Sequence, residues 1–496
     1  MRHCTLDLNS IEDYRRFLKI KALPTYSFTG RTAYYPDEYA AAVEGVAAKV
    51  SDDWKYDPWP GQFDYQRDIS ALSLRKKKFS VFADPGMGKT FIMLEFARNV
   101  RERIGGKRIL IVSPLMVCEQ TMEESVKFLG SELGIEQVRA SQLQSWMNGK
   151  GGIGITNYEA ITEDLDRGNV GALILDESSM LKSMYGAWGT RLIEIGRGLE
   201  YKLCCTGTPA PNDRIEYGNH AVFMDAFPNL NSFLARYFVN RGQTSERWCL
   251  KAHALKPFYR ALSHWCIFLT NPAVYGWKDN VGDLPPIHIH IDRIDITTGQ
   301  RHAMQDMTGN LIMMDAGGIG TRAKLARIGK GFTKDSAIAS NKPEFMRQLC
   351  ASFPDESAII WCKFNDEQDA LHKMLPGSES IQGSTPIEER QRIIHDFKSG
   401  KCRILISKAK ILGFGLNLQI CTRMIFSGLH DSYEEYYQCI KRANRYGSTR
   451  PLNVHIPITE LEEPMVQNVL TKAKRVESDT REQEELFMEI WKGNKC

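Results

Sequence analysis

Residues 80–90 read Ser-Val-Phe-Ala-Asp-Pro-Gly-Met-Gly-Lys-Thr, and a helical pattern follows them. A short strand, a glycine-containing loop and a helix that opens with Lys-Thr form the context of a phosphate-binding loop. Gly86 and Gly88 allow backbone N–H groups to close around phosphate oxygens, and the helix N-terminus adds the positive end of its dipole. Lys89 is expected to reach the β and γ phosphates, and Thr90 to supply a hydroxyl to Mg²⁺.

Two further segments support a nucleotide site, which matters because Ala83 stands where the general loop pattern has a glycine. A second apolar strand ends in Asp176 and Glu177. Such a pair supplies a carboxylate that orients Mg²⁺ and a neighbouring base for the attacking water. Upstream of the loop, the amide of Gln66 can donate to and accept from one adenine edge at once. Together these segments predict ATP and Mg²⁺ as ligands.

Short β-branched runs recur along the chain, each followed by a turn and a helical pattern. Strands that alternate with helices predict parallel α/β sheets, and two series of runs predict two lobes. The first series is 79–83, 109–113, 153–156, 172–175 and 203–206, and the second is 358–361, 403–407, 423–427 and 454–458. The predicted divisions are an N-terminal accessory segment (1–55), a first lobe (56–211), a helical insertion and interlobe linker (212–335), a second lobe (336–475) and a C-terminal helix (476–496).

Composition limits the classes of partner and compartment. The net charge is only +4 at pH 7, so a surface that binds a polyanion must be a local stripe. No apolar stretch approaches the roughly 18 residues of a membrane span, and the N-terminus lacks an apolar signal core. The twelve cysteines include no C-x-x-C pair, which favours reduced, packed thiols. We therefore expect a cytoplasmic protein that has no membrane partner.

In this order the motifs resemble those of the superfamily-two helicases, and within them the Swi/Snf branch of DNA translocases, over residues 63–474. Thr206, Gly207 and Thr208 begin a TGTP sequence, which in that branch couples the nucleotide state to movement. In the second half, residues 383–390, 413–418 and 438–447 are similar to three further motifs of the family.

The resemblance implies two RecA-like lobes and a set of site residues. Gly415 is expected at the nucleotide and Asn417 at the nucleic acid. Arg442 and Arg445 are expected to stabilise the charge of the transition state from the opposite lobe, because guanidinium groups bind phosphoryl oxygens bidentately. The full set expected on the nucleic-acid track is Ser113, Pro114, Thr156, Asn157, Lys363, Ser384 and Asn417.

The function implied by the resemblance is ATP-dependent translocation or strand separation on duplex or branched DNA, independent of sequence. The sequence looks most like the compact forms of bacteriophages and bacteria, which suggests replication, recombination or repair, with proteins of those pathways or of a restriction system as partners. Alternatives stay open: an RNA helicase, against which the TGTP sequence argues, the motor of a restriction or defence complex, and a catalytically silent scaffold.

Three other segments allow two interpretations each. The aromatic and basic N-terminal segment suits either an accessory nucleic-acid-binding module or a small domain packed on the first lobe. Lys324, Arg327 and Lys330 recur at near-helical intervals, and either contact a duplex or face solvent. The tail carries Leu486, Phe487, Ile490 and Trp491 on one side, which favours docking on the protein's own lobe over a partner site.

Overall fold

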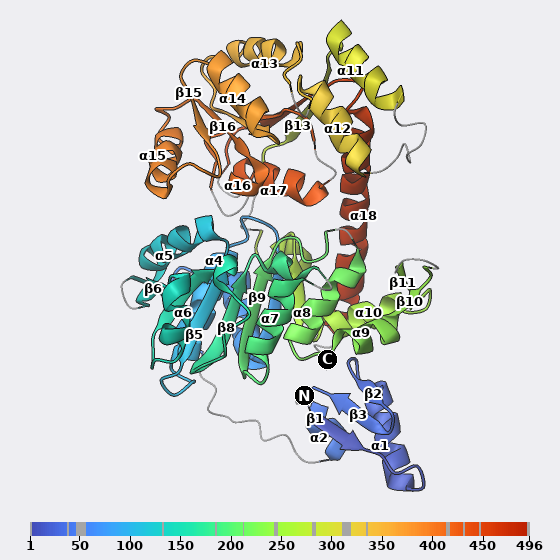
Figure 1. Cartoon of the computed structure of the whole chain (residues 1–496). Helices are drawn as coiled ribbons and strands as arrows, with labels where there is room; N and C mark the ends of the chain where they lie inside the picture. Colours follow the sequence, from blue (N-terminus) through green and yellow to red (C-terminus); the bar gives the residue numbers. More distant parts are fainter. Residues whose placement is uncertain are drawn as a thin grey trace. The chain divides into compact units, whose positions relative to one another are not determined.

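The computed structural model describes residues 2–36, 39–45, 56–130, 133–183, 186–211, 213–242, 247–279, 284–309, 319–333, 336–412, 417–429, 432–445 and 448–493. The chain forms two compact units (Figure 1). Unit 1 comprises Met1–Val281 and Asp479–Cys496, and unit 2 comprises Gly282–Ser478. Each unit contains a parallel sheet with helices packed on it, so the predicted α/β fold with two RecA-like lobes is confirmed.

The sheet of unit 1 has seven parallel strands in the order β12-β4-β9-β8-β5-β7-β6. Five of them are the predicted first series: β4 (Lys78–Ala83), β5 (Arg108–Ser113), β7 (Ile153–Asn157), β8 (Val170–Asp176) and β9 (Tyr201–Thr206). The other two are β6 (Ile135–Gln137) and β12 (Cys266–Leu269). The predicted strands are buried along nearly all of their length and mostly apolar, because both sheet faces are covered.

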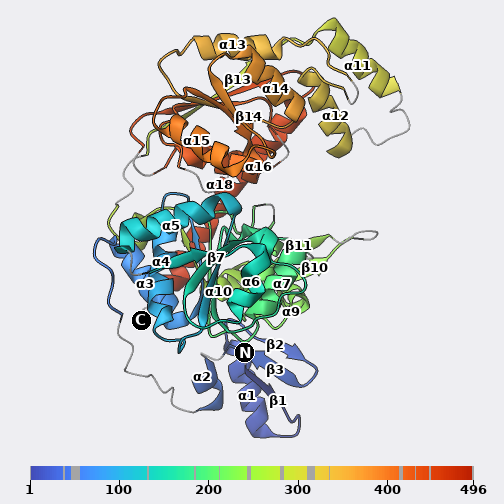
Figure 2. The same ribbon diagram turned by 60° about the vertical axis from the view of Figure 1, so that its left-hand side comes forward.

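Right-handed crossovers assign the helices of unit 1 to the two faces of the sheet (Figure 2). The chain advances across the sheet through α4 (Lys89–Arg101) and α5 (Leu115–Leu129), which cover one face beside α3 (Asp64–Lys76). It returns through α6 (Ala140–Met147) and α7 (Ala187–Gly196), which cover the other. The loops at the carboxyl ends of the strands, where ligands bind in such sheets, contain the predicted nucleotide motifs.

Unit 2 has a six-stranded parallel sheet in the order β13-β18-β17-β14-β16-β15. Its strands are β13 (Ile287–Arg293), β14 (Ala358–Cys362), β15 (Ser378–Ile381), β16 (Ile404–Lys408), β17 (Arg423–Phe426) and β18 (Leu452–Ile458). Beyond the segment 212–335, its helices are α13 (Lys342–Ala351), α14 (Asn365–Met374), α15 (Ile387–Lys398), α16 (Ala409–Leu412) and α17 (Tyr433–Ala443), with the start of α18 (Glu463–Gly493). The four strands predicted for the second lobe are all present.

The segment 212–335 differs from a purely helical connection. Its helices are α8 (Tyr217–Phe223), α9 (Leu230–Tyr237), α10 (Leu255–Leu262), α11 (Thr298–Gly309) and α12 (Ile319–Gly329), and it also forms a hairpin of β10 (Phe238–Asn240) and β11 (Trp248–Leu250). In addition it supplies an edge strand to each sheet, because β12 pairs with β4 and β13 pairs with β18. The four-residue run of β12 is too short to separate from the aromatic helical sequence around it by periodicity.

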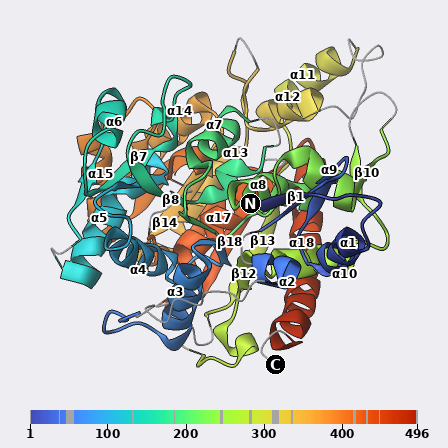
Figure 3. The ribbon, with the colours of Figure 1, turned by 90° about the horizontal axis from the view of Figure 1, so that it is seen from below.

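The N-terminal segment folds as a small β-α-β-β-α layer (Figure 3). Its elements are β1 (Arg2–Thr5), α1 (Ile11–Ala22), β2 (Ser27–Thr29), β3 (Thr32–Tyr35) and α2 (Ala40–Glu44), with an antiparallel sheet in the order β1-β3-β2. Arg236 of α9 stacks 3.7 Å from the centre of the Tyr26 ring and donates a 2.7 Å hydrogen bond to the Tyr26 carbonyl. The interpretation as a domain packed on the first lobe is therefore confirmed, and nucleic-acid binding by it stays a prediction.

The tail helix docks on its own unit, as predicted. Phe487 is fully buried, with its ring centre 5.5 Å from that of Phe268. Glu484 accepts a 3.2 Å hydrogen bond from the backbone N–H of Thr270, which directly follows β12. The side chains of Ile490 and Trp491 lie outside the described set. Over the described ranges, no helix combines the length and apolar character that crossing a membrane requires.

Candidate nucleotide site and nucleic-acid track

The phosphate-binding loop lies between β4 and α4. Gly86 and Gly88 have φ angles of +95° and +67°, in the left-handed region that glycine adopts without steric cost. These turns lead the chain from the strand to the helix N-terminus at Lys89. The Lys89 ammonium group is buried and donates a 2.7 Å hydrogen bond to the carbonyl of Ala83. Its side chain therefore folds back over the loop, where a phosphate ligand would meet it.

The predicted adenine-reading residue lies directly against this loop. Gln66 of α3 is 6% exposed, and its Oε1 accepts a 3.0 Å hydrogen bond from the backbone N–H of Phe63. A Cβ atom on Gly88 would lie only 2.0 Å from Gln66 Nε2. Because no side chain tolerates that distance, the glycine is what allows the amide to meet the loop. The Tyr65 hydroxyl also contacts the loop, because it donates a 3.2 Å hydrogen bond to the carbonyl of Met87.

The carboxylate pair lies at the end of β8. Asp176 is buried and accepts 3.0 Å hydrogen bonds from the Ser113 hydroxyl and from the backbone N–H of Glu177. Burial and the adjacent Glu177 raise the pKa of Asp176 to about 7, although the Ser113 hydrogen bond and Lys89 act in the opposite direction. Glu177 has a φ of +47°, an uncommon conformation for a non-glycine residue. The charged form of such desolvated carboxylates is stabilised when a cation binds beside them.

The TGTP segment follows β9 and touches the phosphate loop. Thr206 is fully buried, and its hydroxyl oxygen accepts a 3.2 Å hydrogen bond from the backbone N–H of Thr208. A Cβ on Gly207 would lie 3.0 Å from Pro85 Cδ and 3.3 Å from the carbonyl oxygen of Ala83. The backbone of this segment therefore packs on the loop with no space for a side chain. This contact is a direct route between the loop and the segment expected to couple nucleotide state to movement.

The first-lobe residues expected on the nucleic-acid track separate into two groups. The hydroxyl of Ser113 is bonded to Asp176, and that of Thr156 donates a 2.8 Å hydrogen bond to the carbonyl of Val138. Both residues are buried, so in this structure their hydroxyls form hydrogen bonds inside the lobe. Pro114 and Asn157, the next residue in each case, are half-buried and have more surface to offer a phosphate backbone.

In unit 2 the expected residues lie on three segments. Ser384 is exposed in a turn that Arg390 holds by donating to the carbonyls of Gly383 and Thr385, at 2.5 and 2.7 Å. Lys363, on the turn between β14 and α14, is half-buried. Asn417 donates a 3.0 Å bond to Gln419, and Gly415 lies outside the described residues.

The two predicted arginines follow each other on α17 and just beyond it. Arg442 is buried and donates a 2.8 Å hydrogen bond to Gln438 Oε1, four residues earlier on the same helix. Arg445 is half-buried, and its backbone N–H donates to the Ser448 hydroxyl at 3.2 Å. The hydrogen bond that Arg442 donates to Gln438 fixes the orientation of its guanidinium group.

Sequence reasoning missed a clamp behind the nucleotide site. Glu95 of α4 is fully buried and accepts hydrogen bonds from Arg98 at 2.7 and 2.9 Å and from the backbone N–H of Trp59 at 3.2 Å. The clamp joins the helix that follows the phosphate loop to the segment that precedes Gln66. In the sequence the pair has only the three-residue spacing of an ordinary exposed helix pair, and no local signal marks it as buried.

Comparisons with known proteins identify two matching family models and several similar proteins. Residues 75–352 match the model of the SNF2-related domain, and residues 341–447 match that of the helicase conserved C-terminal domain. The chain is similar to the ATP-dependent helicase fft1 of Schizosaccharomyces pombe, with 30% identity over 29% of this chain and 16% of that protein. It is also similar to the DNA annealing helicase and endonuclease ZRANB3 of Bos taurus, with 22% identity over 79% of this chain and 38% of that protein.

Among solved structures, the SWI2/SNF2 ATPase core of Sulfolobus solfataricus in complex with dsDNA aligns over 87% of this chain and 97% of that chain. The TM-score is 0.40 and the sequence identity 18%. The chain spans well under half the length of the two curated relatives.

Proposed function

The chain belongs to the SNF2-related family, whose model matches more than half of its length, and from this premise we propose that it is an ATP-driven motor that moves along DNA. The observation that supports the proposal most directly is that two motifs contact one loop and a third lies in the same sheet. Gln66 meets the loop at Gly88, and Gly207 meets it from the other side near Ala83. Asp176 lies at the end of β8, which pairs with β9, the strand that precedes Gly207. The residues that we propose for base recognition, phosphate binding and coupling thus lie around the same loop.

Each of the proposed site residues has its own role in ATP hydrolysis. The loop N–H groups and Lys89 bind the phosphates, and Glu177 accepts a proton from the attacking water. The hydroxyl of Thr90 and the carboxylate of Asp176 are oxygen donors that fit Mg²⁺, and the raised pKa of Asp176 fits a site that gains from a cation. Bound there, the ion would neutralise charge on the phosphates. Arg442 and Arg445 would stabilise the transition-state charge.

The substrate that we propose is DNA, duplex or branched, bound through its backbone without regard to sequence. Two observations support this choice: the TGTP sequence, and the similarity to a DNA annealing helicase over most of the chain. As part of the same proposal, the motor serves replication, recombination or repair in the cytoplasm of a bacterium or of a phage-infected cell. The support for that setting is the compact motif arrangement in the sequence, and protein partners from those pathways belong to the same proposal.

Steady-state hydrolysis of ATP tests the proposal. Turnover would be measured without nucleic acid and then with single-stranded DNA, duplex DNA, a model fork and RNA, at low and moderate salt. We expect duplex or forked DNA to stimulate strongly, and Arg442→Ala to abolish turnover. Stimulation by RNA alone would show that the substrate is RNA and not DNA, and would leave the proposal of an ATP-driven motor intact. If no nucleic acid stimulates the wild-type protein, the proposed function is wrong.

A further inference from the structure

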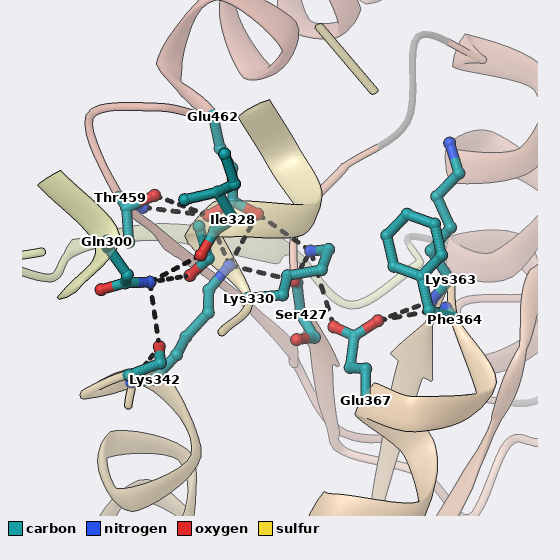
Figure 4. A network of polar contacts seen from close by, with 12 residues as sticks. Gln300, Ile328, Lys330, Lys342, Lys363, Phe364, Glu367, Ser427, Thr459 and Glu462 are labelled. Atoms are coloured by element: carbon teal, nitrogen blue, oxygen red, sulfur yellow. Dashed lines mark hydrogen bonds and ion pairs between the residues drawn. The ribbon is translucent and has the colours of Figure 1, made fainter. Parts of the chain in front are cut away.

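Unit 2 contains a buried charge network that none of the family motifs includes (Figure 4). The network consists of Lys330, Lys342, Glu367 and Glu462, each less than 5% exposed. Lys342 Nζ lies 2.6 and 2.7 Å from the two oxygens of Glu462, and Lys330 Nζ lies 2.9 Å from Glu462 Oε1. Lys330 also lies 3.5 Å from Glu367 Oε1. Both ammonium groups donate to the carbonyl of Ser427 at the end of β17.

The backbone at Gly428 and Thr459 packs directly against the network. Gly428 has a φ of +116°, and a Cβ there would lie 2.2 Å from Lys330 Nζ and 2.3 Å from Glu462 Oε1. Thr459 donates both its backbone N–H and its hydroxyl to Glu462 Oε2, at 3.1 Å each. Burial alone would raise the pKa of Glu462, but the two lysines outweigh it and lower the pKa to about 2. The carboxylate is therefore charged at neutral pH.

Four buried charges are a costly way to stabilise a lobe. Desolvating two cations and two carboxylates costs several kcal/mol per ion, and apolar residues of equal volume are often as stabilising. What an ion network adds is one fixed geometry, because each charge has to meet a partner at a set distance. The elements whose geometry is fixed here are the end of α12, the start of α13, the first turn of α14, the end of β17 and the residue before α18.

One arm of the network reaches the nucleic-acid track. Glu367 Oε2 accepts hydrogen bonds from the backbone N–H groups of Lys363 and Phe364, at 2.9 and 3.3 Å, while its Oε1 faces Lys330. The same carboxylate thus holds the turn that presents Lys363 and is itself held by the lysine that follows α12. Arg327 of α12 adds a 2.6 Å ion pair to Asp366 and lies 5.2 Å from the Phe364 ring centre. The turn is therefore supported by α12 through this ion pair and by the buried Lys330 that follows the helix.

We propose that Lys330 and Glu367 are positioning residues for nucleic-acid binding: they fix the turn that places Lys363 against a phosphate of the DNA backbone. This inference rests on the proposed function, in which Lys363 is a backbone contact. Neither residue touches nucleotide or nucleic acid, so basal hydrolysis should not require them. They should matter for the DNA concentration that gives half-maximal stimulation.

The test is a double-mutant cycle on DNA-stimulated ATP hydrolysis, with Lys330→Met and Lys363→Ala alone and together. We expect either single change to raise the half-saturating duplex concentration about tenfold, the cost of one lost or misplaced charge-assisted contact. With Lys330→Met the basal rate should stay within about twofold. In the Lys363→Ala background, Lys330→Met should add less than about twofold, because both changes remove the same contact. Independent tenfold effects that multiply would overturn the proposal.

Two further variants separate positioning from loss of stability. Lys202→Met removes another fully buried lysine, which is ion-paired with Asp225 in unit 1, and should leave the half-saturating concentration unchanged. An equal increase in that control would assign the effect to stability and overturn the proposal. Glu367→Gln keeps an oxygen acceptor for the two N–H groups and nearly the same volume, so it serves if Lys330→Met does not fold.

We expect Glu367→Gln to raise the half-saturating concentration less than Glu367→Ala does. Equal values in both variants and the wild type would overturn the proposal. The wild-type protein also separates this inference from the proposed function. Stimulation of the wild type with unchanged DNA dependence in every Lys330 and Glu367 variant rejects the inference alone. A wild type that no nucleic acid stimulates rejects both.

Discussion

Buried lysines and carboxylates lie together in both units, but the ratio of lysines to carboxylates differs between the two sets. In unit 1 one lysine, Lys89, stands near two carboxylates, Asp176 and Glu177, and burial with the neighbouring carboxylate raises the pKa of Asp176 to about 7. In unit 2 two lysines meet two carboxylates, and the pKa of Glu462 falls to about 2. The first set has negative charge to share with a ligand cation. The second is neutral as it stands and serves to fix geometry.

The largest effect should come from removing Lys89, the lysine beside the two carboxylates of the predicted nucleotide site. Lys89→Ala should lower kcat by about 10³-fold, because it removes a charged donor from the phosphates, while DNA binding stays nearly unchanged. Turnover is read from phosphate release and binding from fluorescence anisotropy of labelled duplex. Lys202→Met is the matched control, a buried lysine of the same unit outside the site. Full turnover by Lys89→Ala would reject the site assignment.

Removing a carboxylate should have opposite consequences in the two sets. Glu462→Ala leaves two buried ammonium groups without their shared partner and should destabilise unit 2 by about 3–5 kcal/mol. Asp176→Ala removes excess negative charge and should leave the ligand-free protein as stable as the wild type or more so. Urea unfolding of both variants measures the difference. Equal destabilisation by the two changes would contradict the comparison.

The pH dependence of stability should also differ in sign. Glu462 has a folded-state pKa of about 2, below its ordinary 4.5, so its contribution is present above pH 4.5 and is lost as pH falls toward 2. Asp176 has a folded-state pKa of about 7, above its ordinary 3.8, so its burial costs stability at pH 7 and that cost disappears as pH falls toward 3.8. Unfolding followed from pH 8 to 3 in wild type, Glu462→Gln and Asp176→Asn checks both. Each variant should lose only its own part of the profile.

The smallest effects should come from two glycines that leave space for polar side chains, Gly88 beside Gln66 and Gly428 beside Lys330 and Glu462. Gly88→Ala puts a Cβ 2.0 Å from Gln66 Nε2 and should raise the KM for ATP about tenfold, with no change in the stability of unit 2. Gly428→Ala, at a φ of +116°, should destabilise unit 2 by about 1–3 kcal/mol and leave the KM unchanged. If displacement of the amide is the cause, Gly88→Ala should have less effect in a Gln66→Ala background. An equal effect in both backgrounds would assign the change to backbone strain.

The sequence predicted the parts of the fold that have local signals. The nine runs predicted as strands are strands, because a parallel sheet covered on both faces requires continuous apolar stretches. The phosphate loop and the Asp176-Glu177 pair could be predicted from the sequence because the chemistry expected of each depends on adjacent residues. The meeting of Gln66 and Gly88 was not, since it depends on how α3 packs against α4.

The network of unit 2 had no local signal, because its members are separated by 12 to 132 residues. For Lys324, Arg327 and Lys330, the helical spacing suggested one shared face. However, α12 ends at Gly329, so Lys330 leaves the helix and turns inward, while Lys324 stays exposed. Arg327 pairs with Asp366. Neither of the two interpretations, a duplex contact or a solvated face, describes Lys330.

The docking of the tail has a consequence for how the protein is made. Unit 1 includes residues 479–496, and the fully buried Phe487 packs on Phe268 only after all of unit 2 has been synthesised. At a translation rate of about 5–20 residues per second, the 214 positions that separate Thr270 from Glu484 take about 10–40 s. During that interval the ring of Phe268 and the backbone of Thr270 await their partners. Synthesis of unit 1 thus begins before that of unit 2 and is completed after it.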